Sequence, residues 1–459
     1  MKRYSRPEKS VASADRAVAE ALRRDRPLRK FLLAFSKSVS EAGGAAFLAG
    51  GYLRDVAEGA PGGDVDLMVA GLSHRELGRI LSCLPHARVG IRKVVPAGKH
   101  FPVFRVATAW RDGYVDVSTA RGGGPARRLD PLAQALEDAS RRDFTFNSLL
   151  YALSSRGNRL VGELFDPFGG IEDLSRRTIR CVGDAEARLR EDPLRAMRAL
   201  RTKSERKGFR IDEATYRAVR RLGPDLLPGV PSDRLVGELL RSLAANPEGT
   251  LEELRRSGIL RALLPELSRR KGGTARAGRR YRSLRRILRA PVPPEILLAN
   301  LLGDLSPRDA EAAARRLRFP NVRRVLRTLS DLRPLLRPER ARFPLAETEA
   351  ILERAEDPRG LVALYRATCN VSGRRALDLH RFLGTCGKIP RWIDGAWLRR
   401  NGFPDGPARG EILLRVREAS LSGAVRRVDD AVRFAEAMRG GSLEDGPGRP
   451  AGQATRQGI

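Results

Sequence analysis

The chain has 459 residues, a formal net charge of +32 and a sequence pI near 11.2. A positive excess of this size opposes compaction unless a polyanion neutralises it, so nucleic acid is the first partner to consider. Only 10 of the 87 basic residues are lysine, so 77 are arginine. Arginine suits bidentate phosphate contacts, although a coding bias that replaces lysine accounts for part of this preference. With 41% hydrophobic and 5% aromatic residues, the composition favours a helix-rich protein of two to four domains over an all-β one.

The four cysteines argue against a zinc site and a disulfide framework. They lie at positions 83, 181, 369 and 386, and no C-x-x-C pair occurs. A reducing, cytoplasmic environment is the default for such a pattern. The charged N-terminus is followed by no long apolar run, so we expect neither a signal peptide nor a membrane span, and no membrane partner.

Two helices are predicted before the first strand. Residues 1–27 are polar and basic and contain one candidate helix at 14–23. Apolar residues at helical spacing then predict a helix over residues 27–42.

The segment from Ala45 to Val69 reads as strand, tight turn, short helix, loop and strand. Gly50 and Gly51 follow the first strand, where a glycine turn lets backbone N–H groups approach an anion. Asp64 and Asp66 precede and enter the second strand, and the two-residue repeat places them on one face. Paired carboxylates suit Mg²⁺, which takes few carboxylates plus substrate phosphates.

Each half of this segment has an ordinary explanation by itself. Most glycine pairs are only turns, and most D-x-D pairs are only solvated. Because the two occur in one compact unit, they favour phosphate chemistry, and nucleotidyl transfer in particular, more than either does alone.

A third carboxylate follows in the next strands. Residues 94–101 are interpreted as a loop, and residues 104–110 and 114–118 as two strands joined at Arg111-Asp112-Gly113. Asp116 lies between two valines in the second of these strands. It either faces solvent, as in any half-buried strand, or joins Asp64 and Asp66 in a site for two Mg²⁺ ions.

Two further runs combine arginine and aspartate at the start of apolar segments. Arg142, Asp143 and Asn147 belong to the run RRDFTFN at 141–147, which reads either as a helix start or as a donor and acceptor pair for a ribose hydroxyl. Asp192 before Pro193 reads as a strong helix start, and Arg195 lies three residues later on the first turn. This pair either belongs to a solvated helix face or offers an acceptor and a forked donor to the edge of a base.

These motifs together resemble one family. G-G-x-L-R-D at 50–55, D-x-D at 64–66, RRDFTFN at 141–147 and E-D-x-x-R-x-x-R at 191–198 resemble, in the same order, motifs of tRNA nucleotidyltransferases (CCA-adding enzymes of the bacterial and eukaryotic class) and bacterial poly(A) polymerases. The segment VDVSTAR around Asp116 is similar to the family's third carboxylate strand. The resemblance is dense from Ala45 to about Leu264, which is roughly half of the chain.

The resemblance implies a role for each motif. It implies that Asp64, Asp66 and Asp116 hold Mg²⁺ and catalyse the transfer, and that Gly50, Gly51 and Arg54 bind the triphosphate. Arg142, Asp143 and Asn147 would contact the ribose. Asp192 and Arg195 would select the base, with Arg198 and Arg201 close by.

The fold class implied is α+β: a nucleotidyltransferase head with a small mixed β-sheet and helices, followed by an all-helical neck, body and tail. The expected division is a basic segment (1–27), a catalytic head (28–178), a neck and body that read the base and bind RNA (179–265), a helical body and tail that bind tRNA (266–439) and a disordered end (440–459). Within the tail, residues 269–289 are strongly basic and are either a phosphate-contacting surface or a solvated charged loop.

The function implied is template-independent addition of CCA to tRNA 3′ ends from CTP and ATP. Poly(A) polymerase, or a partial enzyme that adds only CC or only A, shares the head motifs, but residues 394–410 resemble the tail of CCA-adding enzymes and favour the tRNA enzyme. A catalytically dead RNA-binding protein is disfavoured by the intact carboxylates. The partners implied are the tRNA acceptor arm and 3′ end, CTP and ATP, and the sequence leaves the oligomeric state open.

Overall fold

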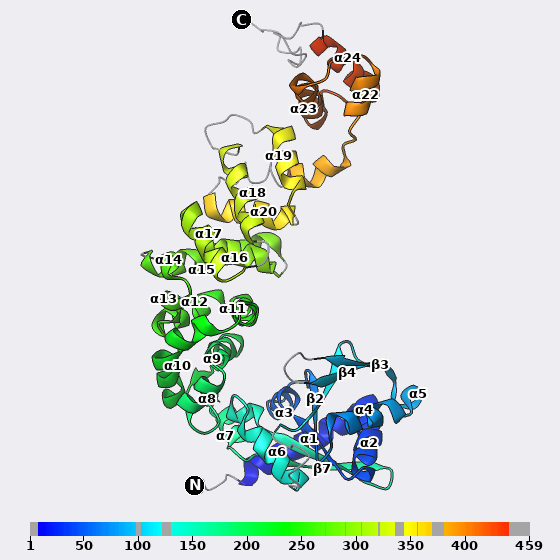
Figure 1. The fold of residues 1–459 in the computed structure, drawn as a ribbon, viewed down its shortest axis with the longest axis vertical. Coiled ribbons are helices and arrows are strands. Elements are labelled where there is room, and N and C mark those ends of the chain that lie inside the picture. The colour runs from blue at the N-terminus through cyan, green and yellow to red at the C-terminus, as the bar shows by residue number, and fades with distance from the viewer. Residues whose placement is uncertain are drawn as a thin grey trace, which may run out of the picture. The chain divides into compact units, whose positions relative to one another are not determined.

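The computed structural model describes residues 8–97, 102–121, 130–270, 272–289, 291–303, 305–319, 322–335, 344–355, 357–369 and 381–439 (Figure 1). Residues 98–101 of the predicted loop and the predicted disordered end at 440–459 lie outside them. The chain divides into two units, Met1–Leu263 and Leu264–Ile459, and each is described by itself. Across the described ranges, no helix is both long and apolar enough to cross a membrane.

The first unit contains a seven-stranded mixed sheet in the order β3-β4-β5-β2-β1-β6-β7. All neighbours are antiparallel except β2 and β5, which run parallel. The predicted mixed sheet is therefore confirmed. Its strands are β1 (Ala45–Ala49), β2 (Val65–Ala70), β3 (Ile91–Ala97), β4 (Val103–Thr108), β5 (Tyr114–Thr119), β6 (Leu150–Arg156) and β7 (Arg159–Phe165).

The central strands are apolar on both faces, as expected for strands covered by helices. On one face Phe47 and Ala49 of β1 and Met68 of β2 pack against Ala135 and Ala139 of α6 (Pro131–Ser140). Helices α1 (Glu8–Arg24) and α2 (Arg26–Glu41) pack against β1, β6 and β7. Asp66 lies on the same face as Met68, because side chains alternate along a strand, and it is thus held beside a dry core.

Strand β3 corrects the prediction of a loop over residues 94–101, because residues 94–97 belong to this edge strand. Its charged residues and Pro96 conceal the alternation expected of a strand, and both features are typical of sheet edges. The apolar run at 148–153, which follows RRDFTFN, enters β6. The hairpin from β6 to β7 turns at Gly157, whose φ of 61° lies in the left-handed region that favours glycine.

The other helical elements of the first unit cover the sheet and continue beyond it. They are α3 (Gly51–Ala57), α4 (His74–Cys83), α5 (His86–Val89), η1 (Thr145–Asn147), α7 (Gly170–Ser175), α8 (Ala185–Glu191), α9 (Leu194–Glu205), α10 (Glu213–Leu226), η2 (Leu227–Gly229), α11 (Ser232–Ala245), α12 (Pro247–Arg256) and α13 (Ile259–Leu263). Short strands β8 (Thr178–Ile179) and β9 (Arg210–Ile211) pair in parallel and bracket α8 and α9.

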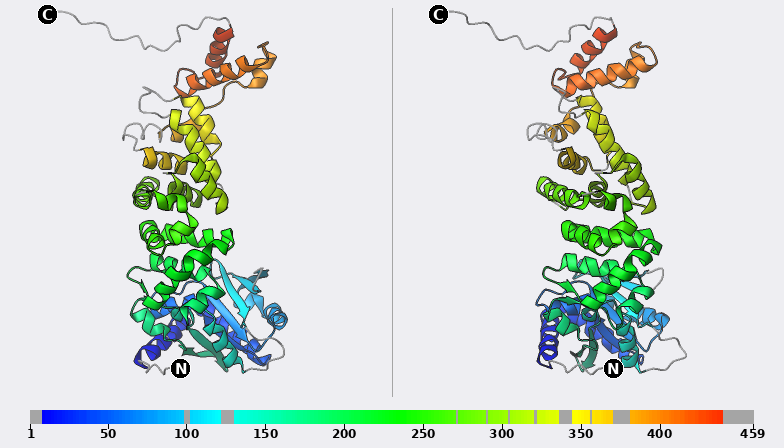
Figure 2. Two further views of the ribbon diagram at one scale, coloured as in Figure 1. Left: turned by 60° about the vertical axis from the view of Figure 1, so that its left-hand side comes forward. Right: turned by 90° about the vertical axis from the view of Figure 1, so that its left-hand side faces the viewer.

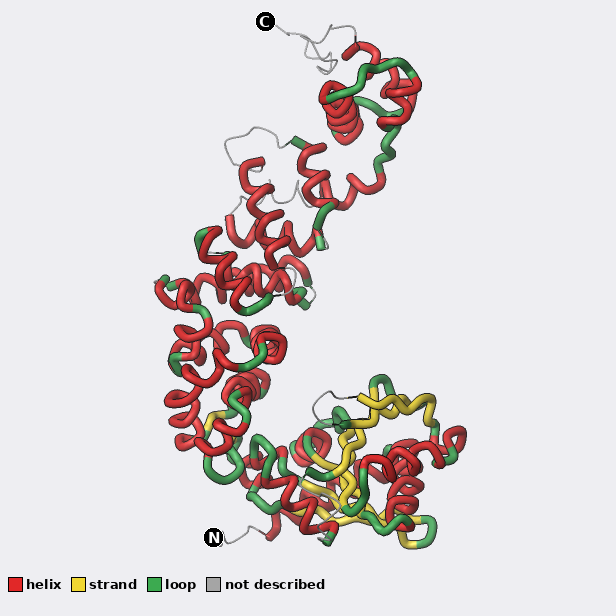
Figure 3. The backbone as a smooth tube through the Cα atoms, viewed as in Figure 1, coloured by secondary structure: helices red, strands yellow, loops and turns green. Residues whose placement is uncertain are grey.

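The described residues of the second unit form helices and no strands, as the colours of Figure 3 show and as the predicted helical body and tail require. They are α14 (Pro265–Arg269), α15 (Gly273–Leu288), α16 (Pro294–Leu302), α17 (Pro307–Arg316), α18 (Val322–Leu335), α19 (Leu345–Glu353), α20 (Pro358–Cys369), η3 (Cys386–Lys388), α22 (Gly395–Arg400), α23 (Pro407–Leu421) and α24 (Val428–Arg439). Figure 2 gives two further views of this arrangement.

Residues 273–288 of the basic run form helix α15 rather than a solvated loop. One side of α15 is buried through Ala277, Tyr281 and Leu284. Arg280 is buried as well, and its Nη2 donates to the carbonyl of Asn300 at 2.7 Å. The run therefore contributes to the core on one face.

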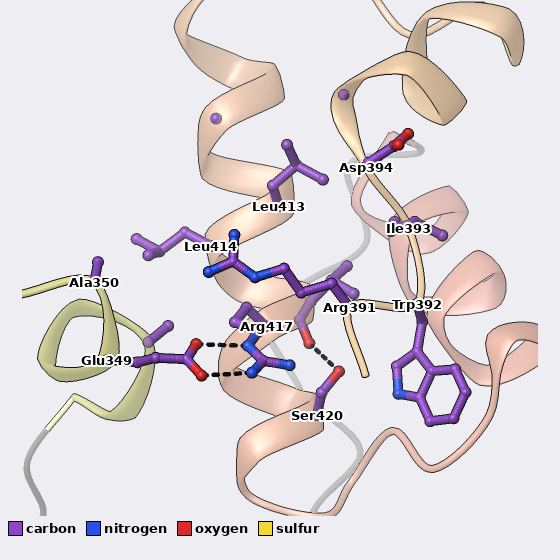
Figure 4. A pocket seen from close by; sticks show the side chains of 14 residues that line it. Glu349, Ala350, Arg391, Trp392, Ile393, Asp394, Leu413, Leu414, Arg417 and Ser420 are labelled. Atoms are coloured by element: carbon purple, nitrogen blue, oxygen red, sulfur yellow. Dashed lines mark hydrogen bonds and ion pairs between the residues drawn. The ribbon is translucent and has the colours of Figure 1, made fainter. Parts of the chain in front are cut away.

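A bidentate ion pair anchors α23 to α19 in the second unit (Figure 4). Arg417 Nε donates to Glu349 Oε2 at 2.6 Å, and its Nη1 donates to the carbonyls of Ile389 and Pro390, both at 2.9 Å. Glu349 is 3% exposed. Because the charge is both paired and hydrogen-bonded, its burial is tolerated.

Candidate active site

Two of the predicted metal ligands are direct neighbours across the sheet. Asp66 on β2 and Asp116 on β5 are register partners in the parallel pair. Asp64 lies at the end of the loop before β2 and is exposed. Asp64 lies near enough to both for its charge to raise their pKa values.

The carboxylates repel one another and are partly dehydrated. The pKa of Asp66 is raised from its ordinary 3.8 to about 6, mainly by burial and in smaller part by Asp116 and Asp64, while Arg142 and Arg54 oppose the rise. Burial also raises the pKa of Asp116, with a contribution from Asp64 and an opposing one from Arg105. A site that holds like charges this close favours a bound cation.

One oxygen in this group lacks a hydrogen-bond donor. Asp116 Oδ1 is buried and accepts no hydrogen bond, and Arg105 Nε is 3.6 Å away as an ion pair. No three carboxylate, imidazole or thiol groups of the described ranges are already gathered as a ligand set. A pair of carboxylates with a free oxygen nevertheless fits Mg²⁺, whose remaining ligands are water and substrate phosphate.

Gly50 lies where a side chain would crowd the charged groups of Arg142 and Asp66. Its φ of 72° is left-handed. A Cβ there would be 3.2 Å from Arg142 Nη1 and 3.3 Å from Asp66 Oδ2. The glycine turn at the start of α3 therefore lets the backbone lie directly beside the carboxylates.

Arg54 is held in place from two sides. Its Nη1 donates to Asn147 Oδ1 at 2.9 Å, and its Nε donates to Asp55 Oδ1 at 3.0 Å. Asn147 Nδ2 in turn donates to Asp143 Oδ1 at 2.9 Å. The triphosphate motif and the ribose motif, 93 residues apart in sequence, thus share one hydrogen-bond chain.

Arg142 is also held by hydrogen bonds beside Asn147. Its Nη1 donates to the carbonyl of Asn147 at 3.1 Å. Its Nε and Nη2 both lie 3.4 Å from Asp138 Oδ2, a buried carboxylate one helical turn earlier. The RRDFTFN run is therefore not a simple helix start, because only residues 145–147 form a single 3₁₀ turn.

Asp192 and Arg195 are both present but do not pair with each other. Pro193 is already helical, with φ −57°, and Asp192 Oδ1 accepts from Leu194 N at 3.2 Å, as predicted for a helix start. Asp192 Oδ2 lies 3.4 Å from Arg234 Nη2. Arg195 is buried, and it donates to the carbonyls of Arg188 and Arg141 at 3.0 and 2.6 Å.

Arg198 and Arg201 have different positions. Arg198 Nη1 lies 3.5 Å from Asp143 Oδ2, so it connects the ribose motif to α9. Arg201 instead pairs with Glu238 Oε2 at 2.6 Å and with Glu205 Oε1 at 3.1 Å. Of the predicted nucleotide-binding residues, only Arg201 does not line the cavity described next.

A cavity of about 1080 Å³ collects these groups. It is lined by the other predicted nucleotide-binding residues and by Asp64 and Asp66, whereas Asp116, on the neighbouring strand, does not belong to the lining. Sequence reasoning missed five charged lining residues, which are Asp55, Arg121, Asp138, Arg141 and Arg234. The i, i+4 spacing of Asp138 and Arg142 is a signal that could have found one of them. The abundance of guanidinium groups beside a carboxylate pair suits a polyphosphate with a divalent cation.

Comparisons with known proteins agree with this geometry. Residues 46–180 match the family "Poly A polymerase head domain", and residues 208–270 match "Probable RNA and SrmB- binding site of polymerase A". A "Multifunctional CCA protein" of Xanthomonas campestris pv. campestris is 35% identical over 240 residues, which cover 50% of this chain and 53% of that protein. The chain thus matches about half the length of its curated relatives.

Two solved structures extend the likeness in fold. A CCA-adding enzyme with ATP has a TM-score of 0.71 at 21% identity, covering 94% of this chain and 98% of that one. The Bacillus stearothermophilus CCA-adding enzyme in complex with CTP has a TM-score of 0.65 at 26% identity, covering 90% of this chain and 98% of that one.

Proposed function

We propose that the chain belongs to the family of tRNA nucleotidyltransferases and bacterial poly(A) polymerases and adds CCA to tRNA 3′ ends from CTP and ATP without a template. One observation carries the proposal. Asp66, the register partner of Asp116, lies beside the glycine turn that begins α3, and Arg54 of that helix lines the same cavity as Asp66.

The carboxylates would hold Mg²⁺. Asp66 and Asp116, with Asp64 from the preceding loop, supply the oxygen ligands that this ion prefers. When bound, the ion lowers the pKa of a 3′-hydroxyl and neutralises the triphosphate. Arg54 and the backbone at Gly50 and Gly51 bind the phosphates and orient the α-phosphate toward the attacking oxygen.

The remaining lining residues would read the nucleoside. Asp143 and Arg142 contact the ribose, positioned by Asn147. Asp192 accepts from the base, and Arg234, whose Nη2 lies 3.4 Å from Asp192 Oδ2, holds that carboxylate at the cavity wall. Arg195 already donates to two carbonyls, so we infer that it mainly fixes the backbone around Asp192 and offers its remaining N–H groups to the base.

The tRNA acceptor arm is the proposed partner of the helical part. The exposed arginines of α15, at 279, 285 and 286, follow one side of the helix and suit recognition of an RNA backbone by phosphates and shape. A cytoplasmic location belongs to the same proposal, since Cys83, Cys181 and Cys386 are free thiols.

The test uses one purified tRNA that lacks its last three nucleotides, with Mg²⁺, CTP and ATP, and product lengths resolved to one nucleotide. We expect extension to stop at plus three, and at plus two when ATP is omitted. Long tails from ATP alone would instead identify a poly(A) polymerase. A stop at plus two with both nucleotides, or extension only of a tRNA that already ends in CC, would identify a partial enzyme.

A further inference from the structure

Arg206 lies outside the cavity but bonds to its wall. It follows the last residue of α9, and its Nη2 donates to Asp55 Oδ1 at 2.8 Å. Its Nη1 pairs with Glu58 at the end of α3. Its guanidinium also lies over the ring of Phe209, with Cζ 5.5 Å from the ring centroid. Arg206 therefore has a fixed position that joins α9 to α3.

The acceptor of this bond is the same oxygen that holds Arg54. Asp55 Oδ1 accepts from Arg54 Nε at 3.0 Å and lies 2.9 Å from Arg54 Nη2. Asp55 thus lies between two guanidinium groups, one that lines the cavity and one that does not. The Arg54, Asp55 and Arg206 side chains are 19–21% exposed, so their interactions are only partly screened by water.

The charges in this cluster balance only when Arg206 is present. Asp55 and Glu58 carry two negative charges, and Arg54 and Arg206 carry two positive ones. Without Arg206, the cluster around Arg54 has a net charge of −1. At Arg54, a bound polyphosphate would then meet a guanidinium that is outnumbered by two carboxylates.

We propose that Arg206 is a positioning residue for triphosphate binding: through Asp55 it fixes the guanidinium of Arg54 and leaves its charge available to the phosphates. The inference rests on the proposed function, because that function makes the anion a nucleoside triphosphate. Arg206 contacts neither the ribose residues nor the base-reading pair in the described structure. Its influence is therefore equal for CTP and ATP.

The experiment measures equilibrium binding of CTP and of ATP to the full chain in Mg²⁺. For Arg206→Gln we expect both dissociation constants to rise by about tenfold, with their ratio unchanged. Arg217→Gln is the matched control, since Arg217 is an exposed arginine that pairs only along its own helix with Glu213. Arg206→Lys keeps the charge and is expected to recover part of the affinity.

A second variant separates charge positioning from a merely structural connection between α3 and α9. Glu58→Gln removes the ion pair between Glu58 and Arg206 and one negative charge near Arg54. It keeps the hydrogen bond between Arg206 and Asp55. We expect it to bind CTP and ATP as well as the wild type or more tightly. If it weakens binding as Arg206→Gln does, Arg206 only connects the helices and the inference is overturned.

Failure of the inference and failure of the proposed function have different signatures. Equal affinities for wild type and Arg206→Gln would overturn the inference alone. A change in the CTP to ATP ratio would overturn it too, because the effect would then reach the base. A wild-type chain that binds neither nucleotide would overturn the proposed function and the inference with it.

Discussion

Carboxylates withdrawn from water occur in both units, fully buried at Glu349 and half-buried at Asp66 and Asp116, and the protein treats them in opposite ways. Glu349 in the second unit is paired at both oxygens by Arg417, whose other donors are taken by backbone carbonyls. Asp66 and Asp116 in the first unit lie side by side, each with a raised pKa, and one oxygen of Asp116 has no donor. Both arrangements withdraw carboxylates from water, but only the first pairs both oxygens through hydrogen bonds, whereas Arg105 Nε lies 3.6 Å from Asp116 Oδ1.

The difference distinguishes a structural from a functional use of the same chemistry. A buried charge that is fully paired fixes two helices relative to each other. A buried pair of like charges costs stability, and such a cost is typical of a site that waits for a ligand. Changes to the two carboxylate sets should therefore separate stability from activity.

The largest expected effect is on activity in the first unit. Asp66→Asn removes a proposed metal ligand, so we expect nucleotide incorporation to fall by about 10³-fold or more. The same change relieves repulsion with Asp116 and Asp64, so the melting temperature should stay the same or rise. Incorporation assays and thermal unfolding on one preparation check both. A variant that loses activity because it unfolds would contradict this comparison.

The second effect is on stability in the other unit. Glu349→Gln leaves Arg417 buried without its carboxylate, so we expect the second unit to lose about 3 kcal/mol of unfolding free energy. Denaturant unfolding followed by tryptophan fluorescence measures it, since Trp392 lies near the pair (Figure 4). The control is Glu411→Gln, whose exposed partner Arg415 lies 3.6 Å away. Equal losses from both variants would show that burial does not decide the value of the pair.

A third change compares two arginines on α9 that both approach Glu238. Arg198→Gln removes a cavity residue that contacts Asp143, so we expect the KM for the nucleotide to rise about tenfold. Arg201→Gln removes a side chain outside the cavity lining and should lower stability with little change in KM. Steady-state kinetics beside thermal unfolding tests the pair. A larger KM effect from Arg201 would restore the sequence-based assignment of that residue to the nucleotide.

The smallest effect is a pH dependence of stability without metal. The pKa of Asp66 is about 6 in the folded chain and 3.8 ordinarily, so the folded state binds more protons between about pH 4 and 6. The free energy of unfolding should therefore fall as pH rises through that window. With a chelator present, we expect the melting temperature of the wild type to drop relative to that of Asp66→Asn between pH 4 and 6. Above pH 7 the two melting temperatures should change with pH in parallel. If the two melting temperatures changed in parallel at every pH, the pKa of Asp66 would not be raised by folding.

The sequence allowed prediction of the parts whose signal is local. Strand β1 was predicted at its observed bounds, β2 one residue short and the β4–β5 hairpin within two residues, because apolar runs bounded by glycine determine them. Gly50, Arg54 and Asp143, which line the cavity, were also predicted, because each lies in a short sequence motif.

The rest depends on contacts between distant segments. Edge strand β3 was missed because Pro96 and its charged residues hide the alternation of a strand. The hairpin of β6 and β7 is a different case, since its Gly157-Asn158 turn signal was available in the sequence. The partners of Asp192 and Arg195 could not be predicted, because Arg234 and the Arg141 carbonyl come from segments 42 and 54 residues away. Helical spacing alone likewise could not show that Arg201 turns away from the cavity.

The most direct test of the contrast between the two carboxylate sets is Mn²⁺ binding in the presence of CTP, followed by the electron paramagnetic resonance signal of the free ion. Mn²⁺ prefers the same oxygen ligands as Mg²⁺. We expect the wild type and Asp112→Asn, which changes an exposed hairpin carboxylate, to bind the ion, and Asp66→Asn with Asp116→Asn to lose that binding. Equal Mn²⁺ binding by all three proteins would contradict the claim that these two strand carboxylates serve as ligands for a metal.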